Sequence, residues 1–324
     1  MKAIQVREFG NPDVMKLEDV ADPTPGAGEV LIRVKAAGIN PVDAGLRSGM
    51  HPRSKLLALP WTPGIDAAGE VISVGPGVEG LEAGDRVFGS ASGGSYAEQA
   101  VLAANRTAKL PAHLSFEEGG SFPVVLYTAH YAVVHRGGVR AGETVLIQAG
   151  AGGVGSMAIQ IAKAAGARVL TTVSSKAKAD FCRSLGADVT INYREEDFAA
   201  RCLAETDGLG VDVVIEPVAS ENFDKDCEAL RTFGRLVILG AGTGKSLTGS
   251  VTYPPFYSKD IDVLGFSLFN ADAVFPHMLR QVDRLLEQGL VKAAVGETIP
   301  LAEAARAHDL LMTGKIFGKI VLTA

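Results

Sequence analysis

The stretch 142–163 constrains this chain more than any other part, and it reads GETVLIQAGAGGVGSMAIQIAK. Residues 144–148 are a short apolar run rich in β-branched side chains, which indicates a buried strand. Three glycines follow in G-x-G-x-x-G spacing: Gly150, Gly152 and Gly155. From Val154 onward, apolar residues recur at helical spacing. A strand, a glycine turn and a helix in this order predict a site for a dinucleotide pyrophosphate, because glycines allow close backbone approach and a helix N-terminus presents free N–H groups.

The first 125 residues have the pattern of a β-rich domain. Turn signals such as DPTPGAGE and VGPGVEG separate short apolar runs, which fall at 30–34, 68–74, 85–89 and 97–102. This spacing predicts a barrel or a sandwich. Residues 40–63 are expected to form a long irregular connection, and loops of that length often line a binding site.

From about residue 126 the pattern alternates between strands and helices. Apolar runs typical of buried strands fall at 144–148, 168–173, 189–192, 211–216, 235–239 and 261–266. Helical spacing is found at 127–135, from 154, at 177–185 and at 223–230, then at 273–287 and 301–311 before a last strand at 318–322. The alternation predicts a doubly wound parallel sheet with helices on both faces. The fold class is therefore α/β, with a β-rich domain and a dinucleotide-binding domain.

The composition limits the classes of function. A length of 324 residues accommodates two domains, and a formal net charge of −6 argues against broad nucleic-acid binding. No apolar run has the length of a membrane span or of a signal-peptide core, so the chain is expected to be cytoplasmic with no membrane partner. The three cysteines are too few and too scattered for a disulfide framework or a structural zinc site: Cys182, Cys202 and Cys227.

The end of the second strand of the alternating region bears on the choice of dinucleotide. NAD sites usually place an acidic residue there, about 20 residues after the first glycine. Here residues 173–178 read VSSKAK, and no carboxylate appears before Asp180. The hydroxyls of Ser174 and Ser175 and the ammonium of Lys178 suit a 2′-phosphate, which predicts NADPH. The alternative is a serine-capped helix with solvated lysines.

No metal-binding or nucleophile motif accompanies the glycine turn. The six histidines form no H-E-x-x-H pair, and His130 and His135 lie five apart, off the one-face helical spacing of three or four. No metal is therefore expected. The segment 240–246, GAGTGKS, lacks the first glycine of a P-loop and is interpreted as a loop at the cofactor cleft. G-x-S-x-G is also absent, so no catalytic residue is assigned.

With these residues placed, the chain resembles the zinc-independent quinone oxidoreductases, the ζ-crystallin-like branch of the medium-chain dehydrogenase/reductases. The resemblance covers essentially the whole chain. The signature around the dinucleotide turn matches in full, including Gln160 and Lys163. Further matching stretches are AAGINPVDAGLRSG (36–49), PWTPGIDAAGEV (60–71), GDRVFG (84–89), GGSYAE (93–98), LYTAH (126–130), LGADVTINYRE (185–195), DVVIE (212–216) and FGKIVL (317–322).

The resemblance implies an arrangement of domains and a mode of catalysis. Residues 1–125, completed by 266–324, would form a GroES-like catalytic domain, and 126–265 a Rossmann domain, with NADPH held between them. A homodimer is also implied. Zinc-dependent relatives carry a cysteine at the position of Asn40 and a His-Glu pair at Ile65-Asp66, so metal-free catalysis is expected.

The resemblance also implies a set of cofactor-binding residues, with Lys178 favoured over Lys176 by register. These residues are Asn40, Thr128, Gly150, Ala151, Gly152, Gly153, Val154, Ser174, Ser175, Lys178, Tyr193, Gly240, Ala241, Phe266, Ser267, Leu268 and Lys319.

One departure from the family concerns the substrate pocket. Relatives often carry tyrosines at the positions of Gly45 and His51, and both rings are absent here. This chain therefore has no tyrosine at these positions that could be assigned as a proton donor. We expect a wide, partly apolar acceptor pocket that includes Gly45, His51 and the lone Trp61.

The expected activity is hydride transfer from NADPH to a quinone. Without zinc, an alcohol–ketone reaction lacks its Lewis acid, so a quinone or an activated C=C bond is the better acceptor. The alternatives within this class are 2-alkenals or enones and enoyl thioesters. An alternative of another class is an NADPH-binding protein with a structural or RNA-binding role, against which the negative charge and the lack of a basic run both argue.

Overall fold

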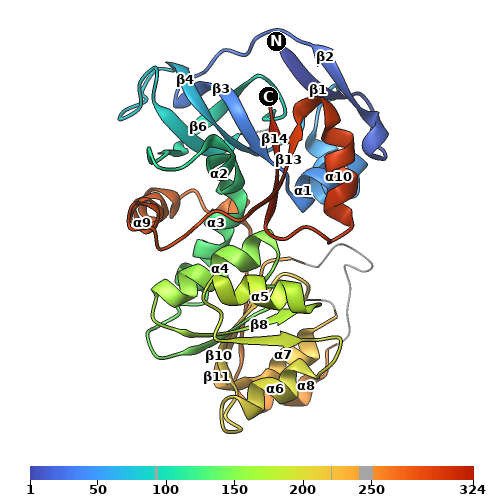
Figure 1. The fold of residues 1–324 in the computed structure, drawn as a ribbon, viewed down its shortest axis with the longest axis vertical. Coiled ribbons are helices and arrows are strands. Elements are labelled where there is room, and N and C mark those ends of the chain that lie inside the picture. Colours follow the sequence, from blue (N-terminus) through green and yellow to red (C-terminus); the bar gives the residue numbers. More distant parts are fainter. Residues whose placement is uncertain (92–93, 220, 241–250) are drawn as a thin grey trace. The chain divides into compact units, whose positions relative to one another are not determined.

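The computed structural model describes residues 1–91, 94–219, 221–240 and 251–324. The chain divides into two compact units (Figure 1). The first unit comprises Met1–Val125, Ala273–Glu287 and Ala293–Ala324. The second comprises Leu126–Asp272 and Gln288–Lys292. Each unit has its own sheet.

The first unit is built on a six-stranded sheet in the order β13-β14-β3-β4-β5-β6. A further pairing of β3 with β6 closes four of these strands into a barrel, as the spacing of apolar runs predicted. The strands are β3 (Glu29–Gly38), β4 (Asp66–Val74), β5 (Arg86–Ala91), β6 (Gln99–Lys109), β13 (Val295–Pro300) and β14 (Lys319–Thr323). A separate antiparallel pair was not predicted from the sequence: β1 (Lys2–Val6) and β2 (Met15–Asp19).

The helices of the first unit correct one expectation. Residues 40–63 are not a long irregular connection, because they contain a helix and the 3-10 turn Pro52–Leu56. That helix begins where Asn40 caps it in a reciprocal capping box with Asp43, with Pro41 in the first turn. The helices of this unit are α1 (Pro41–Ser48), α2 (Phe116–Ser121), α9 (Phe275–Glu287) and α10 (Ala304–Met312), and α3 (Pro123–His130) begins in it.

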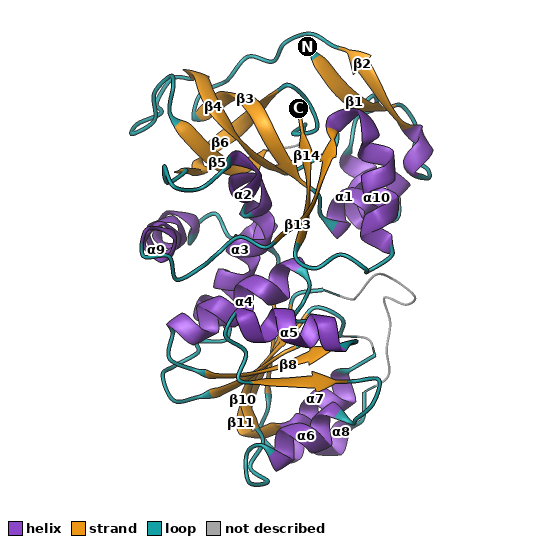
Figure 2. Ribbon diagram, in the orientation of Figure 1, coloured by secondary structure: helices purple, strands orange, loops and turns teal. Residues whose placement is uncertain are grey.

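The second unit is a doubly wound sheet, which confirms the α/β fold class. All its strand pairs are parallel, in the order β12-β11-β10-β7-β8-β9 (Figure 2). Helices α4 and α5 cover one face, and α6, α7 and α8 cover the other. The strands are β7 (Thr144–Ile147), β8 (Arg168–Val173), β9 (Val189–Asn192), β10 (Val211–Glu216), β11 (Leu230–Ile238) and β12 (Asp262–Gly265). The helices are α4 (Gly153–Ala164), α5 (Lys176–Ser184), α6 (Phe198–Ala204), α7 (Phe223–Ala229) and α8 (Tyr253–Ser258).

One helical segment of the second unit differs from the sequence interpretation. Residues Tyr131–Arg136 form a π-helical turn rather than a continuation of α3. In a π-helix each hydrogen bond joins residues five apart in sequence, so two such residues lie on the same face. The rings of His130 and His135 therefore lie 5.5 Å apart between centroids, although their spacing had placed them on different faces of an α-helix.

Candidate active site

The predicted dinucleotide turn lies at the carboxyl end of β7, where α4 begins. Gly152 is the N-cap of α4, and its N–H donates to the carbonyl of Ala149 at 3.0 Å. Ala149 itself has a φ of 54°, in the left-handed region that a side chain rarely adopts. The turn thus directs the start of a 12-residue helix, with its unpaired backbone N–H groups, to the edge where open α/β sheets bind their ligands.

Two glycines of the turn are required by close contacts. A Cβ on Gly150 would lie 2.0 Å from Oγ1 of Thr171, and a Cβ on Gly155 would lie 2.4 Å from the carbonyl oxygen of Ala149. By contrast, a Cβ on Gly152 would meet only that carbonyl, at 3.3 Å. The first and third glycines therefore pack the strand, turn and helix together, and Gly152 leaves the backbone open for a close approach by the pyrophosphate.

The predicted 2′-phosphate residues lie at the end of β8 and the start of α5. Ser175 is the N-cap of α5, and its Oγ accepts from the N–H of Lys178 at 3.3 Å. Lys176 is committed to an ion pair with Asp180 at 2.6 Å on the helix surface. Lys178, which the family register favours for the phosphate contact, lies in the first turn of the same helix.

The remaining predicted cofactor residues of the second unit lie on its loops and on α3. Thr128 is buried on α3, and Tyr193 is half exposed just after β9. Phe266 follows β12 and stacks edge-on against Tyr131, with ring centroids 4.9 Å apart. Ser267 and Leu268 begin the next 3-10 turn. Gly240 is the last described residue before 241–250, so Ala241 and most of the segment 240–246 lie outside the described residues.

In the first unit, Asn40 and Lys319 meet a third residue, Asp66, in a fully buried cluster. The Lys319 ammonium donates to the side-chain oxygen of Asn40 and lies 3.0 Å from Oδ2 of Asp66. The Asn40 amide donates to the same Asp66 oxygen at 2.9 Å. Burial raises the pKa of Asp66, whereas Lys319, Asn40 and the N–H of Val124 act in the opposite direction. Both ends of the Asn40 amide are thereby fixed.

A second buried network adjoins this cluster, and sequence reasoning missed it. Asp43 accepts from the N–H of Asn40 at 2.8 Å and from the hydroxyl of Tyr96 at 3.2 Å. That hydroxyl also lies 3.2 Å from Nε2 of His308. Burial and the nearby Asp66 raise the pKa of Asp43 to about 7. Burial, with Arg47 nearby, lowers the pKa of His308 to about 3, so His308 is neutral in this network.

The three predicted pocket residues have different surroundings. Gly45 is partly buried on α1 at a φ outside the left-handed range, and a Cβ there would meet only the Cβ of His51, at 3.4 Å. Nδ1 of His51 accepts from the N–H of Arg53 at 3.2 Å, and burial lowers the pKa of that imidazole. Trp61 is partly buried against the core of the first unit.

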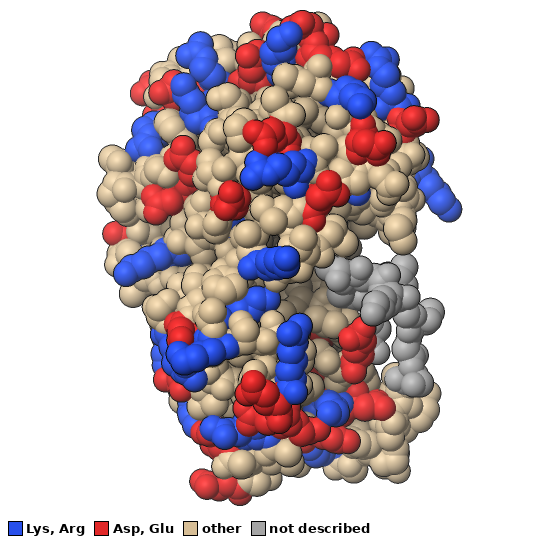
Figure 3. Space-filling model, turned by 45° about the vertical axis from the view of Figure 1, so that its right-hand side comes forward, with Lys and Arg blue, Asp and Glu red and all other residues tan. Residues whose placement is uncertain are grey.

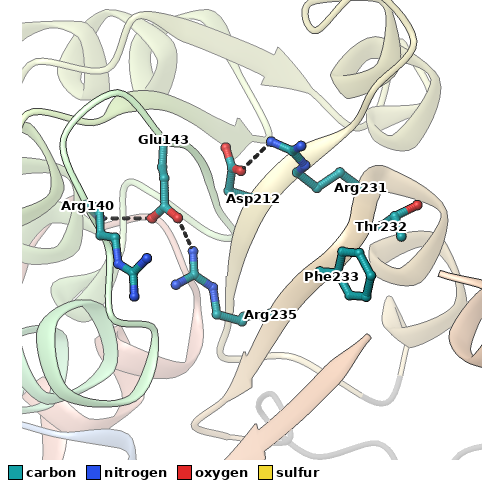
Figure 4. A pocket seen from close by; sticks show the side chains of 7 residues that line it. All are labelled: Arg140, Glu143, Asp212, Arg231, Thr232, Phe233 and Arg235. Atoms are coloured by element: carbon teal, nitrogen blue, oxygen red, sulfur yellow. Dashed lines mark hydrogen bonds and ion pairs between the residues drawn. The ribbon is translucent and has the colours of Figure 1, made fainter. Parts of the chain in front are cut away.

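A surface cavity of about 290 Å³ lies at the other edge of the second sheet (Figure 4). Glu143 directly precedes β7 and pairs with Arg235 at 2.5 Å. Asp212 is the second residue of β10 and pairs with Arg231 at 2.9 Å. The cavity is therefore at the amino ends of the strands. Dinucleotides bind outside the carboxyl ends, so this cavity is not the predicted cofactor site.

The described residues offer no group of three or more His, Cys, Asp or Glu side chains placed to hold a metal ion. The cysteines are free and buried. No helix among the described residues is both long and apolar enough to span a membrane. On the face shown in Figure 3, basic and acidic side chains are interspersed, without the single-signed stripe that a polyanion-binding surface presents.

Comparison with known proteins agrees with this architecture. Residues 26–112 match the alcohol dehydrogenase GroES-like domain, and residues 153–287 match the zinc-binding dehydrogenase family. The quinone oxidoreductase of Rattus norvegicus is 38% identical over 99% of this chain and 97% of its own length. Among solved structures, the Escherichia coli quinone oxidoreductase complexed with NADPH is 31% identical, with a TM-score of 0.90 and full coverage of both chains. A mycobacterial protein complexed with NADPH is 35% identical, with the same TM-score and coverage.

A GroES-like barrel and a doubly wound unit carrying a glycine turn define a medium-chain dehydrogenase/reductase. Within that superfamily, the full-length identities show that the chain belongs to the quinone oxidoreductase family. The family and fold class expected from the sequence are thereby confirmed.

Proposed function

We propose that this protein is an NADPH-dependent, zinc-independent oxidoreductase that reduces quinones. The observation that carries the proposal is the glycine turn at the carboxyl edge of the second sheet, in a chain whose full-length relatives are named quinone oxidoreductases. The turn fits the cofactor. Packing within the protein explains Gly150 and Gly155 but not Gly152, where an added Cβ would have space, and a bound pyrophosphate would explain the glycine at that position. When bound, NADPH supplies a hydride from its nicotinamide to the acceptor.

The proposed roles of the chain's residues follow from their places. Residues 150–154 would hold the pyrophosphate at the start of α4, and Ser174, Ser175 and Lys178 would hold the 2′-phosphate. Asn40 and Thr128 would border the nicotinamide, with Tyr193, Gly240, Ala241, Phe266–Leu268 and Lys319 as further cofactor residues. In this proposal residues 1–125 and 266–324 form the catalytic domain and 126–265 the cofactor domain.

Zinc independence is supported by the chemistry of the buried cluster. Asn40 and Asp66 stand where zinc-dependent relatives carry ligands, and here both bind the Lys319 ammonium. A cation supplied by the protein already neutralises the one carboxylate of the cluster. An amide and an ion-paired carboxylate are poor partners for a metal that prefers thiolate and imidazole.

The proposal is tested by measuring NADPH oxidation with a panel of 1,4-quinones, 2-alkenals, enones and enoyl thioesters. We expect the quinones to give the highest kcat/KM, before and after dialysis against a chelator. Faster turnover of an alkenal or thioester would assign the C=C reductase alternative. NADPH binding without turnover of any acceptor would favour a structural or RNA-binding protein, and activity lost on chelation and restored by zinc would contradict the metal-free site.

Cofactor preference gives a first mutational prediction. Lys178→Ala should raise the Kd for NADPH by about tenfold or more, because a hydrogen bond to a charged group is worth about 1.5–3 kcal/mol. The Kd for NADH should be unchanged. Lys176→Ala is the matched control, since that ammonium is paired with Asp180. Equal effects of the two substitutions, or a wild type that prefers NADH, would contradict the assignment.

The acceptor pocket gives a second prediction. Gly45→Tyr should lower kcat/KM for large quinones more than for small ones. The tyrosine ring, which relatives often carry at this position, would occupy part of the acceptor pocket and leave less space for a large substrate. The backbone at position 45 lies outside the left-handed region and an added Cβ would meet only the Cβ of His51, at 3.4 Å, so the variant should fold. Met50→Tyr adds a ring at a residue 77% exposed on the same segment and serves as the control. An unchanged ratio in a folded Gly45→Tyr protein would exclude position 45 from the pocket.

The assembly and location are part of the same proposal. We infer a cytoplasmic homodimer, as the family resemblance implies. Among the described residues, strand β12 is an edge of the second sheet, which leaves its outer N–H and C=O groups for pairing with another chain, and Val263 on it is 37% exposed. Light scattering of the purified protein at several concentrations would give twice the mass of the 33.7 kDa chain if this is correct.

A further inference from the structure

A buried hydrogen-bond network lies beneath the dinucleotide turn. Gln148, the residue after β7, donates from its amide to Asp226 at 2.8 Å. Its amide oxygen accepts from the hydroxyl of Thr172 at 2.6 Å, and the Thr172 oxygen accepts from the N–H of Ala149 at 3.1 Å. All three side chains are at most 2% exposed. The chain of bonds thus links helix α7 to Ala149, the left-handed residue that begins the turn.

At the far end of this network two carboxyl groups face each other. Asp226 on α7 interacts with Glu216, the last residue of β10, and neither is exposed. Glu216 accepts from the N–H of Val218 and from the amide of Asn222, the latter at 2.9 Å. Among the described residues, Oδ2 of Asp226 has no hydrogen-bond donor. Glu216 therefore has the donors that a carboxylate needs, and Asp226 has an oxygen without one.

The charged groups that the structure describes near this pair do not neutralise it. Lys225 on the same helix binds Asp197 at 2.5 Å on the surface. The Lys259 ammonium is held by backbone carbonyls, with that of Leu230 at 2.7 Å. The nearby thiols are uncharged at neutral pH, because burial raises the pKa of Cys202 to about 12 and that of Cys227 to about 11.

Two buried carboxyl groups that interact, with no cation beside them among the described residues, favour holding one proton between them, because two negative charges at close range repel each other. The donors of Val218 and Asn222 occupy Glu216 oxygens as hydrogen-bond acceptors. A proton on Oδ2 of Asp226 gives that oxygen a hydrogen bond to donate. Burial and the neighbouring Glu216 both raise the pKa of Asp226 well above its ordinary value, which agrees with this placement.

We propose that Asp226 and Glu216 share a proton carried by Asp226, and that this acid pair positions the dinucleotide turn through Gln148. With its proton donated to Glu216, Asp226 keeps its other oxygen for the Gln148 amide. Gln148 then orients Thr172, which fixes the N–H of Ala149 in a conformation that a side chain disfavours. The inference rests on the proposed function, because it concerns the affinity of the turn for NADPH.

Isosteric variants locate the proton. In Asp226→Asn, the amide donates permanently to Glu216 and its oxygen still accepts from Gln148, so the Kd for NADPH should stay within about twofold of wild type. In Glu216→Gln, an NH₂ group replaces an oxygen that accepts from Val218 or Asn222, so one of these donors loses its acceptor. This variant should raise the Kd for NADPH by about tenfold. Gln148→Leu breaks the link to the turn and should have a similar effect. Glu228→Gln, an exposed carboxyl on the same helix, is the control.

The readouts separate a positioning role from a structural one. Gln148→Leu should raise the KM for NADPH while kcat at saturating NADPH is retained. In thermal melting of the apoprotein, Asp226→Asn should be close to wild type and Glu216→Gln less stable. Equal losses in Asp226→Asn and Glu216→Gln, or the reverse order, would overturn the shared-proton assignment. Unchanged NADPH affinity in folded Gln148→Leu would overturn the positioning role. Failure of the proposed function looks different, because wild type itself would then not bind NADPH.

Discussion

Replacing Lys319 by methionine is expected to destabilise the first unit by about 3–5 kcal/mol. Methionine fills a similar volume, but it leaves the Asp66 carboxylate at 0% exposure without its cation. Removing one partner of a buried ion pair costs more than the pair itself contributes, because an uncompensated charge stays in the interior. Thermal melting should show a fall on the order of 10 °C in the transition of this unit.

The neutral double variant provides the decisive comparison. Asp66→Asn together with Lys319→Met removes both charges, so it should recover most of the stability that Lys319→Met loses. Lys315→Met is the matched control, since that lysine is exposed just before β14. If the single and double variants melt alike, or if Lys319→Met melts like wild type, Lys319 does not neutralise Asp66 in the folded protein.

The second unit could be predicted almost element by element, for a physical reason. Strands of a parallel sheet are buried on both faces, so they read as continuous apolar runs. Residues 168–173, 189–192 and 211–216 are strands in the structure with the predicted bounds. Helices α6 and α8, of seven and six residues, were not predicted, although α7, which also has seven residues, was.

The first unit was harder because its short elements depend on contacts distant in sequence. Helix α1 had a local signal, since asparagine, proline and aspartate at 40, 41 and 43 form a capping box, but the glycine at position 45 obscured it. Strand β1 is completed by isolated bridges from Ala3 to Ala97 and from Val6 to Trp61, which no local pattern reveals.

The candidate site shows the same limit. The family resemblance supplied Asn40 and Lys319 as separate cofactor residues, 279 positions apart. It did not show that Asp66 joins them, because pairing between side chains is a property of the folded barrel. Likewise, Glu216 ended an apolar run and Asp226 lay in a charged helix, and only the packing of α7 on the sheet brings these two acids together.

Substituting Asp43 by asparagine is expected to remove a pH-dependent loss of stability from the first unit. The folded-state pKa of Asp43, about 7, lies above its ordinary value of 3.8. A raised pKa means that the folded state binds the proton more tightly than the unfolded state. This stabilisation is complete below about pH 3.8 and is lost as pH rises to about 7, where the loss amounts to about 4 kcal/mol.

Asparagine is a close mimic of the protonated acid, and the geometry allows it. Its oxygen can accept from the N–H of Asn40 and the hydroxyl of Tyr96, and its NH₂ group replaces an oxygen, Oδ1, that has no hydrogen-bond partner among the described residues. The ionisable groups that act on Asp43 are Asp66, Lys319 and Tyr96, the neutral His308 lies beside the Tyr96 hydroxyl, and the substitution leaves all four in place. The other titrating groups therefore cancel when variant and wild type are compared.

The measurement is urea unfolding of both proteins from pH 5 to pH 8.5. The stability of Asp43→Asn relative to wild type should rise by about 3 kcal/mol across this range, since about two pH units lie between pH 5 and the folded-state pKa of Asp43, at about 1.4 kcal/mol per unit. Glu79→Gln, which removes an exposed carboxyl of the same unit, should run parallel to wild type. A constant difference between Asp43→Asn and wild type would mean that Asp43 is already ionised at pH 5, and that Lys319 compensates two buried carboxylates instead of one.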